Sequence, residues 1–372
     1  MKRSAFIKIV GSGVVAGSIG SMFESCSVNQ TKKYSDDVLV VVRVKGGMDG
    51  YHLISPKEND LLLKLRPNIQ KSIEQKGINY RNNWFINPNF AVIADLNEKG
   101  WLQIIPNVGY SDYNRLSHFK AQDYWETGSV VGDKVQHRTG WAGRLVDNNI
   151  IQVNGNKSPI LIIDNEQTLF DKGENSSGVY YTPFNTYSNL FPLVEDWINE
   201  NKNSLENKQI YQRVEEQYRI NQLLKETSPN SVSSKDMKGK LDQIADCIEK
   251  ELPFRVYNLT QSGYDTHHKQ TIRLEPLALD LFNGLNQFAE RLQQGNNWGR
   301  VKVLVYTEFG RTIAENSNGG TDHGTANHTY LLGGNLGDKW LNPSFEFNTM
   351  KIAGNDYLTI NEDFREIYKS LI

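Results

Sequence analysis

The stretch from Val301 to Gly334 constrains the fold most strongly, because it places a polar, glycine-rich loop between two apolar runs. The runs Val301–Tyr306 and Thr329–Leu332 are typical of buried strands. Open α/β sheets bind their ligands in the loops at the ends of such strands. The stretch therefore predicts an α/β fold with a binding site beside these two strands.

The loop between the two runs contains five side chains that could bind a metal ion or an anion: Glu308, Arg311, Asp322, His323 and His328. An adjacent Asp–His pair and a further histidine are ligand types that Zn²⁺ and related metals take. A solvated loop that only connects two strands would give the same pattern. In that interpretation Glu308 and Arg311 form an ion pair worth roughly a few tenths of a kcal/mol.

Two other predicted strands also end in polar loops. Val38–Val44 is a nearly continuous β-branched run, and Asp49 follows it after a glycine-rich turn. Arg255–Leu259 is followed by Asp265 and His267, which project to the same side if the backbone is extended. We expect a central, mostly parallel sheet flanked by helices, with these loops at one edge. Asp49 considered alone would more simply be a turn aspartate.

Ser117 stands at the predicted start of a helix that continues through Trp125, and His118 follows it directly. The simplest role for this serine is to cap the helix. The alternative is a catalytic nucleophile or an anion contact, because backbone N–H groups at a helix start stabilise negative charge. The sequence leaves both roles open.

The seven histidines are not scattered evenly along the chain. Four of them lie in loops beside predicted strands: His267, His268, His323 and His328. The helical, polar region of residues 182–251 contains none. We interpret that region as surface helices inserted into a single α/β domain that spans residues 38–372.

The charge and cysteine content exclude two classes of protein. A formal net charge of −2 makes the chain as a whole unsuited to binding nucleic acid. The two cysteines, Cys26 and Cys247, are too few for a disulfide framework. At 372 residues the chain is long enough to bury a large hydrophobic core instead.

The first 26 residues differ in composition from the rest. Lys2 and Arg3 precede an apolar run that ends at Cys26, which predicts an export signal. The run is too short for a comfortable transmembrane helix. Cys26 could be acylated and tether the chain to a membrane, or a plain signal peptide could be cut nearby. Residues 27–37 are polar and predict a flexible linker. We expect an exported protein of the periplasm or cell envelope.

Nine motifs carry a family resemblance: KGGMDG (45–50), LRPNI (65–69), NVGYSDYNRLSHF (107–119), YWETG (124–128), TGWAGR (139–144), GYDTHHKQ (263–270), TEFGRT (307–312), GTDHGTA (320–326) and EDFREIY (362–368). As a set they resemble domain-of-unknown-function family 1501. Its members are exported bacterial proteins grouped with the alkaline-phosphatase and sulfatase-like fold. The resemblance spans essentially the whole chain after the first 26 residues.

The resemblance implies a metal-dependent hydrolase that holds two ions. By position in the motifs it implies two ligand sets: Asp49, Asp322 and His323 for one ion, and Asp265, His267 and His328 for the other. The implied cofactor is a divalent metal, with Zn²⁺ the first choice and Ca²⁺, Mg²⁺ or Mn²⁺ the alternatives. The implied partner is an anionic ester, either a small molecule or a polymer.

The implied reaction is the hydrolysis of a phosphate or sulfate ester between two metal ions. Ser117, or a water molecule, would attack the ester. Arg311 or Lys45 would bind its anionic oxygens, since a guanidinium fork matches two of them. Glu308 would accept a hydrogen bond that orients a ligand histidine.

Two other interpretations stay open. One is a non-catalytic envelope protein that keeps the hydrolase fold as a binding module. The other is a metal-stabilised structural component of a surface complex, with a second envelope protein as its partner. The first is favoured by the spacing from Asp265 to His267, which is shorter than the spacing that the resemblance leads one to expect.

Overall fold

The structure is a computed structural model that describes residues 36–57, 59–80, 83–111, 116–133, 137–153, 158–164, 166–181, 191–202, 208–227, 236–340, 346–352 and 355–371. The predicted export signal, including Cys26, and nearly all of the predicted linker lie outside these ranges. No helix among the described residues is long and apolar enough to cross a membrane.

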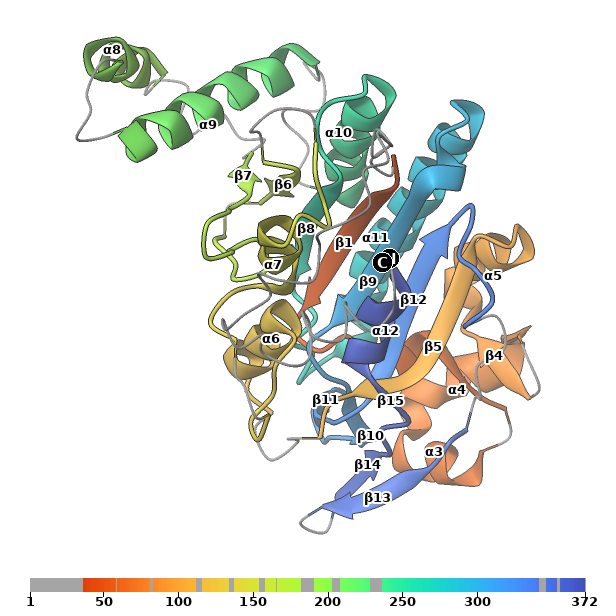
Figure 1. The fold of residues 1–372 in the computed structure, drawn as a ribbon. Coiled ribbons are helices and arrows are strands. Elements are labelled where there is room, and N and C mark those ends of the chain that lie inside the picture. Colours follow the sequence, from red (N-terminus) through yellow and green to blue (C-terminus); the bar gives the residue numbers. More distant parts are fainter. Residues whose placement is uncertain are drawn as a thin grey trace, which may run out of the picture.

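One sheet of eight strands forms the centre of the molecule (Figure 1). From one edge to the other its order is β15 (Glu362–Asp363), β5 (Leu102–Gly109), β12 (Asn327–Gly333), β9 (Val301–Thr307), β1 (Val38–Lys45), β8 (Val256–Ser262), β6 (Ile160–Ile163) and β7 (Val179–Tyr180). All four strands that the apolar runs predicted belong to it. The prediction of an α/β fold with a central sheet is therefore confirmed.

The sheet is mostly parallel, as predicted. Only β12 runs antiparallel to both of its neighbours, β5 and β9. The remaining pairings are parallel. The carboxyl ends of β1, β5, β8 and β9 therefore meet at one edge, together with the first residues of β12. Loops that are far apart in the sequence converge at this edge, where open α/β sheets bind ligands.

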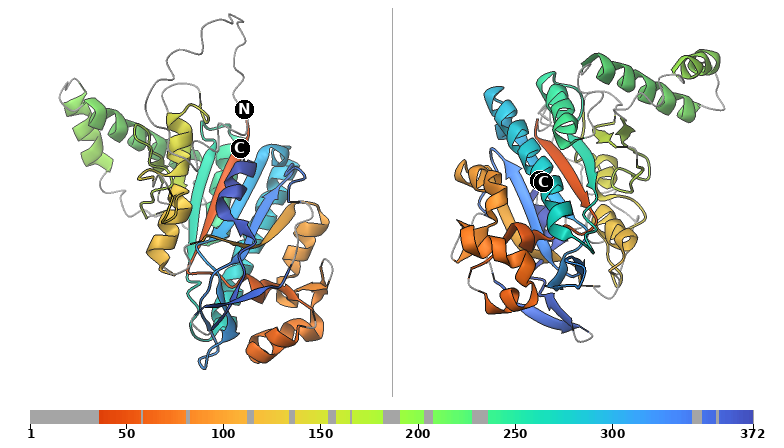
Figure 2. Two further views of the ribbon diagram at one scale, coloured as in Figure 1. Left: turned by 60° about the horizontal axis from the view of Figure 1, so that its bottom comes forward. Right: turned by 180° about the vertical axis from the view of Figure 1, so that it is seen from behind.

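Helices cover both faces of the sheet (Figures 1 and 2). One face packs against α5 (Ala91–Glu98), α10 (Met237–Glu249) and α11 (Gln270–Gln294). The other packs against α6 (His118–Thr127), α7 (Trp141–Asp147) and α12 (Phe364–Leu371). Because the sheet is covered on both sides, its strands need apolar side chains in both directions.

The sequence of β1 meets this requirement. Val40, Val42 and Val44 point into the core beneath α10 and α11. Leu39 and Val41 point into the core beneath α6, α7 and α12. Full burial of such a side chain stabilises the fold by about 1.5–3 kcal/mol. The nearly continuous apolar run thus fixes β1 in the middle of the sheet, with the next residues of the chain at the carboxyl edge.

The helical region predicted over residues 182–251 contains three described helices. Figure 1 shows α8 (Phe191–Asn201) and α9 (Lys208–Thr227) projecting from the β7 side of the molecule. The third, α10, instead packs along α11 on the sheet. The assignment of this region as an insertion in a single domain stays a prediction.

Short elements complete the fold, most of them around the carboxyl edge of the sheet (Figure 1). They are α2 (Gly50–Leu53), β2 (Ile54–Pro56), α3 (Asp60–Leu65), α4 (Pro67–Lys76), β3 (Ile78–Asn79), β4 (Trp84–Ile86), η1 (Pro88–Phe90), η3 (Trp298–Arg300), β10 (Arg311–Glu315), β11 (Thr321–His323), β13 (Thr349–Ile352) and β14 (Asn355–Leu358). Of these, η3 lies at the opposite edge, directly before β9. The hairpin of β10 and β11 carries the Asp–His pair of the sequence analysis.

Candidate metal centre

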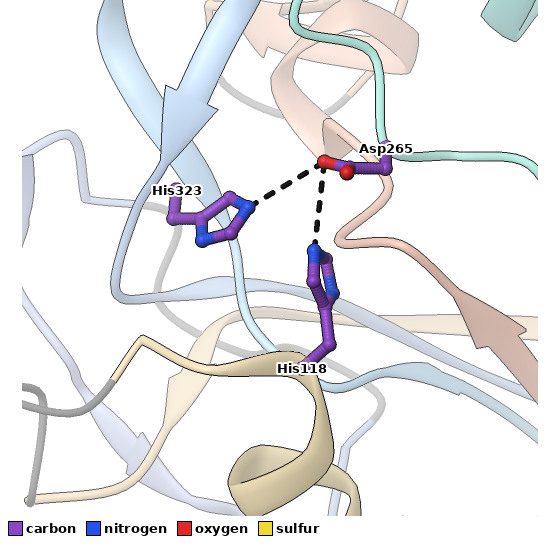
Figure 3. Close-up of side chains that lie close together, drawn as sticks. All are labelled: His118, Asp265 and His323. Carbon is purple, nitrogen blue, oxygen red and sulfur yellow. Dashed lines mark ion pairs between the residues drawn. The ribbon is translucent and has the colours of Figure 1, made fainter.

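Three side chains from three separate elements meet at the carboxyl edge of the sheet (Figure 3). His118 is the first residue of α6, Asp265 lies in the loop after β8, and His323 ends β11. One ligand atom from each lies within 4.8 Å of the others. Among the residues that the structure describes, these three side chains form a group that is close enough together to hold a metal ion.

The group is centred on Oδ1 of Asp265. Nε2 of His118 and Nε2 of His323 each lie 3.5 Å from this oxygen. His267 joins the group, with its Nε2 atom 3.0 Å from the same oxygen and 3.1 Å from Nε2 of His323. Three imidazoles therefore aim their Nε2 atoms at one carboxylate oxygen.

The opposite nitrogen of each imidazole is held by an acceptor. Nδ1 of His118 lies 2.6 Å from Oε1 of Glu308. Nδ1 of His267 lies 2.7 Å from Oδ1 of Asp322. Nδ1 of His323 donates to the carbonyl oxygen of Leu116 at 2.8 Å. This network assigns the proton of each neutral ring to Nδ1 and leaves the Nε2 lone pair facing the centre.

These contacts fit a bound cation. Nε2 of His118 is buried and has no hydrogen-bond partner among the described residues. Nε2 of His267 and Nε2 of His323 face each other as acceptors, with no proton to share in this tautomer. Ligand atoms about 2.0–2.2 Å from a tetrahedral Zn²⁺ ion lie roughly 3.3 Å apart. The distances from Oδ1 of Asp265 to the three Nε2 atoms and the distance between Nε2 of His267 and Nε2 of His323 are 3.0–3.5 Å, close to that value.

The electrostatics also favour the protonation states that bind metals. Burial works to raise the pKa of Asp265, but the hydrogen bond and charge of Arg311 outweigh it and hold that pKa below its ordinary value. Burial lowers the pKa of His323. Asp265 is therefore ionised and His323 neutral at pH 7, which are the forms in which both side chains coordinate metals.

Glu308 is placed in the role that the sequence suggested, but on a different histidine. Its carboxylate is buried behind His118 and also accepts from the backbone N–H of Gly46 at 2.9 Å. Burial acts to raise the pKa of Glu308, but the hydrogen bond and charge of His118 together with backbone hydrogen bonds, including that from Gly46, outweigh it, so the net shift is downward. A buried carboxylate on Nδ1 orients a ligand histidine and raises its basicity.

Asp322 lies outside the group of ligand atoms and differs in this from the expectation. Its side chain is 60% exposed, and Oδ1 is used by Nδ1 of His267. Asn316 donates to the same oxygen at 3.3 Å. The hairpin turns His323 towards the centre and Asp322 behind His267, because adjacent residues of an extended strand point in opposite directions.

Asp49 also differs from the expectation, because its carboxylate is not among the ligand atoms that converge on the centre. Its buried carboxylate accepts from Arg66 at 2.9 Å and from the amide of Gln270 at 2.7 Å. The amide oxygen of Gln270 in turn accepts from the hydroxyls of Thr266 and Thr321. Asp49 therefore contacts the loops that carry His267 and His323 only indirectly, through Gln270, and its own charge is compensated by an arginine.

His328 differs too, because it is fully buried. Its ring stacks on Tyr51 with the centroids 4.7 Å apart, and its Nε2 atom lies 3.1 Å from the carbonyl oxygen of Ile54. Burial lowers the pKa of His328 to about 4, so the ring is neutral at pH 7. The contacts make it a core histidine. The two predicted ligand sets thus become one group among the described residues.

The two cations expected to bind the ester have other partners. The guanidinium of Arg311 is fully buried and bonds to Asp265 and to backbone carbonyls. Lys45 forms an ion pair with Glu166. The expectation that Arg311 binds the ester is wrong, because a guanidinium that is fully buried cannot reach a substrate.

Ser117 is the N-cap residue of α6, but its side chain makes no capping hydrogen bond and is exposed. Its neighbour His118 is the ligand candidate that the sequence analysis did not single out. In the sequence, His118 follows the strand β5, as His267 follows β8 and His323 follows β9. This shared position after a strand could have identified His118 from the sequence. It was applied to Ser117 but not to His118.

The comparisons with known proteins place this site in a family context. A search of curated proteins found no match. Among solved structures, the lipoteichoic acid synthase LtaP from Listeria monocytogenes is 9% identical with a TM-score of 0.36, covering 85% of this chain and 69% of that chain. The C-terminal periplasmic domain of EcEptC from Escherichia coli, in complex with Zn, is 9% identical with a TM-score of 0.39, covering 82% and 74%.

A third solved structure is the PsFucS1 sulfatase from Pseudoalteromonas sp. It is 9% identical with a TM-score of 0.32, and the match covers 81% of this chain and 62% of that chain. The sequence matches the family described as "Protein of unknown function (DUF1501)" over residues 106–338, more than half of its length. The chain therefore belongs to the DUF1501 family, as its motifs predicted.

Proposed function

We propose that this protein binds one divalent metal ion, with Zn²⁺ the best fit, through His118, Asp265, His267 and His323. The observation that carries the proposal is the convergence of three Nε2 atoms on Oδ1 of Asp265. Three nitrogens and one carboxylate oxygen are a ligand set that Zn²⁺ takes in proteins. Ca²⁺ and Mg²⁺ prefer oxygen ligands and fit this set less well. Mn²⁺ is disfavoured in the same way.

We further propose that the metal site hydrolyses phosphate or sulfate esters. When bound, a divalent ion would draw electron density from an ester oxygen. The hydroxyl of Ser117 would serve as the nucleophile that attacks the ester. It is exposed at the start of α6 and adjacent in sequence to His118. The backbone N–H groups in the first turn of α6 would attract the anionic ester. Asp265 and Glu308 would keep the imidazoles in place.

A metal-binding protein without turnover is the second candidate. The observation that favours it is the engagement of both predicted ester-binding cations, Arg311 with Asp265 and Lys45 with Glu166. In this role the protein would be an exported component of the periplasm or cell envelope. It would be tethered through an acylated Cys26 and bound to an envelope partner.

The test compares wild type with Ser117→Ala in the presence and absence of Zn²⁺. Generic phosphate and sulfate esters serve as substrates, and Ser370→Ala is the matched control. Ser370 lies in α12, at the opposite edge of the sheet near the start of β9. Hydrolysis that needs Zn²⁺ and falls at least 100-fold in Ser117→Ala supports the hydrolase. Stoichiometric metal without any turnover in wild type favours the binding protein instead.

A further inference from the structure

Arg311 lies directly beneath the metal-binding group. Nη2 of its guanidinium lies 2.8 Å from Oδ1 of Asp265, the oxygen on which the three imidazoles converge. The side chain has no exposed surface. It therefore touches a proposed ligand from the protein side and cannot meet the substrate.

The remaining donors of Arg311 bind backbone carbonyl oxygens of three different segments. Nε donates to Gly47 at 2.6 Å, and Nη2 also donates to Gly46, so both bonds go to the loop after β1. Nη2 donates to Tyr264 in the loop after β8 at 2.9 Å. Nη1 donates to Thr321 in β11 at 3.0 Å. One planar fork thus joins the segments before Asp265 and before His323.

We propose that Arg311 is the positioning residue of the metal site. It sets the distance between Asp265 and His323 by binding the carbonyl oxygens of Tyr264 and Thr321, which precede them in the chain. It also holds Oδ1 of Asp265 in place. This inference rests on the proposed metal binding. It adds that Arg311 is the residue that keeps the ligands in a fixed arrangement. Ligands held in advance by the protein bind metal more tightly than ligands that must be ordered.

A second buried arginine provides a matched control. Arg66 is 1% exposed and bonds to Asp49 at 2.9 Å, to the carbonyl of Ile313 at 2.6 Å and to that of Thr312 at 2.7 Å. It resembles Arg311 in burial, in its carboxylate partner and in its carbonyl contacts. Its carboxylate partner, however, is not one of the proposed ligands.

The experiment compares Arg311→Lys with Arg66→Lys in the full chain. Lysine keeps the positive charge but cannot replace the planar fork, whose donors point in several fixed directions. Affinity for Zn²⁺ is measured by calorimetry, and the ligand geometry by the visible absorption of bound Co²⁺. We expect Arg311→Lys to weaken Zn²⁺ binding at least 10-fold and to change the Co²⁺ spectrum. Arg66→Lys should lower the melting temperature while keeping both the affinity and the spectrum of wild type.

Arg311→Gln is the second variant, in case the lysine form does not fold. Wild-type affinity and spectrum in either folded Arg311 variant would overturn the positioning role while leaving the metal site intact. Equal losses of affinity in Arg311→Lys and Arg66→Lys would also overturn it, because the effect would then be general destabilisation. Absence of metal binding in wild type would sink the proposed function itself, and the positioning role with it.

Discussion

Glu308 holds Nδ1 of His118 at 2.6 Å, and through this contact the loop after β9 fixes the start of α6. The contact joins residues 190 positions apart in the chain. It turns Nε2 of His118 towards Asp265, where it lies buried without a hydrogen-bond partner among the described residues. A carboxylate behind an imidazole is the arrangement that supports metal-ligating histidines.

Glu308→Gln tests this support. The amide keeps an acceptor of similar size but removes the charge, so His118 becomes less basic and less firmly oriented. We expect Zn²⁺ affinity to fall about 10- to 100-fold with the fold retained. Glu315→Gln is the control, because Glu315 accepts from the first turn of α4, away from the group. Equal affinities for wild type and Glu308→Gln would contradict this role.

His323→Ala and Asp322→Asn test the different roles of two neighbouring residues. His323 is a proposed ligand, and Asp322 supports the ligand His267. His323 faces the centre, whereas Asp322 contacts only the far nitrogen of His267 within the group. We expect His323→Ala to abolish detectable Zn²⁺ binding and Asp322→Asn to weaken it about 10- to 100-fold. Calorimetry of both variants beside wild type measures this. The reverse order of losses would restore Asp322 as a direct ligand.

Asp49→Asn should damage the fold rather than the metal site. The change leaves the buried guanidinium of Arg66 without its carboxylate, which costs about 3–5 kcal/mol of unfolding free energy. We expect urea unfolding at pH 7 to show this loss, with Zn²⁺ affinity unchanged when folded protein is measured. The exposed Asp95→Asn in α5 is the control. Loss of metal from a fully folded Asp49→Asn variant would return Asp49 to the ligand set.

The same ion pair predicts part of the acid sensitivity. Burial alone would raise the pKa of Asp49, but the charge of Arg66, together with His52, Gln270 and Arg311, outweighs it and lowers that pKa below its ordinary value. Its contribution to stability is therefore complete above the unfolded-state pKa of about 3.9 and is lost as the pH falls through the lower folded-state value. Wild type should show this acid loss in urea titrations below about pH 4, and Asp49→Asn should lack it.

His328 predicts a pH dependence nearer neutrality. Burial lowers its pKa to about 4, whereas an unfolded histidine titrates near 6.5. The unfolded chain therefore gains a proton between these values, and stability falls as the pH decreases. We expect this residue to remove about 2 kcal/mol of unfolding free energy between pH 7 and pH 5. His328→Phe should lose less stability over that range than wild type, and the exposed His268→Gln should lose as much.

The central strands could be predicted from the sequence because their side chains are apolar in both directions. Val38–Val44 and Val301–Tyr306 are apolar runs interrupted only by Arg43 and Lys302, and both lie in the middle of the sheet as β1 and β9. The loops that follow them had to meet once the sheet was parallel. Asp265, His267 and His323 could therefore be predicted to lie near one another.

The assignment of ligands within the loops could not be predicted in the same way. Asp49 and Asp322 have the ligand chemistry, but Arg66 and His267 occupy their carboxylates. Which carboxylate receives an arginine depends on α3, α4 and the β10–β11 hairpin, whose packing leaves no periodic signal in the sequence. The prediction for His328 was wrong for a related reason, because a histidine at the start of a strand can face either the core or the site.

The metal content of the purified full chain tests the central claim most directly. Wild type would be loaded with Zn²⁺, freed of excess by desalting and analysed for metal and protein, beside a His118→Ala, His323→Ala double variant. The account predicts about one ion per chain in wild type and none in the double variant. Wild type without metal after loading, or equal metal in both proteins, would contradict it.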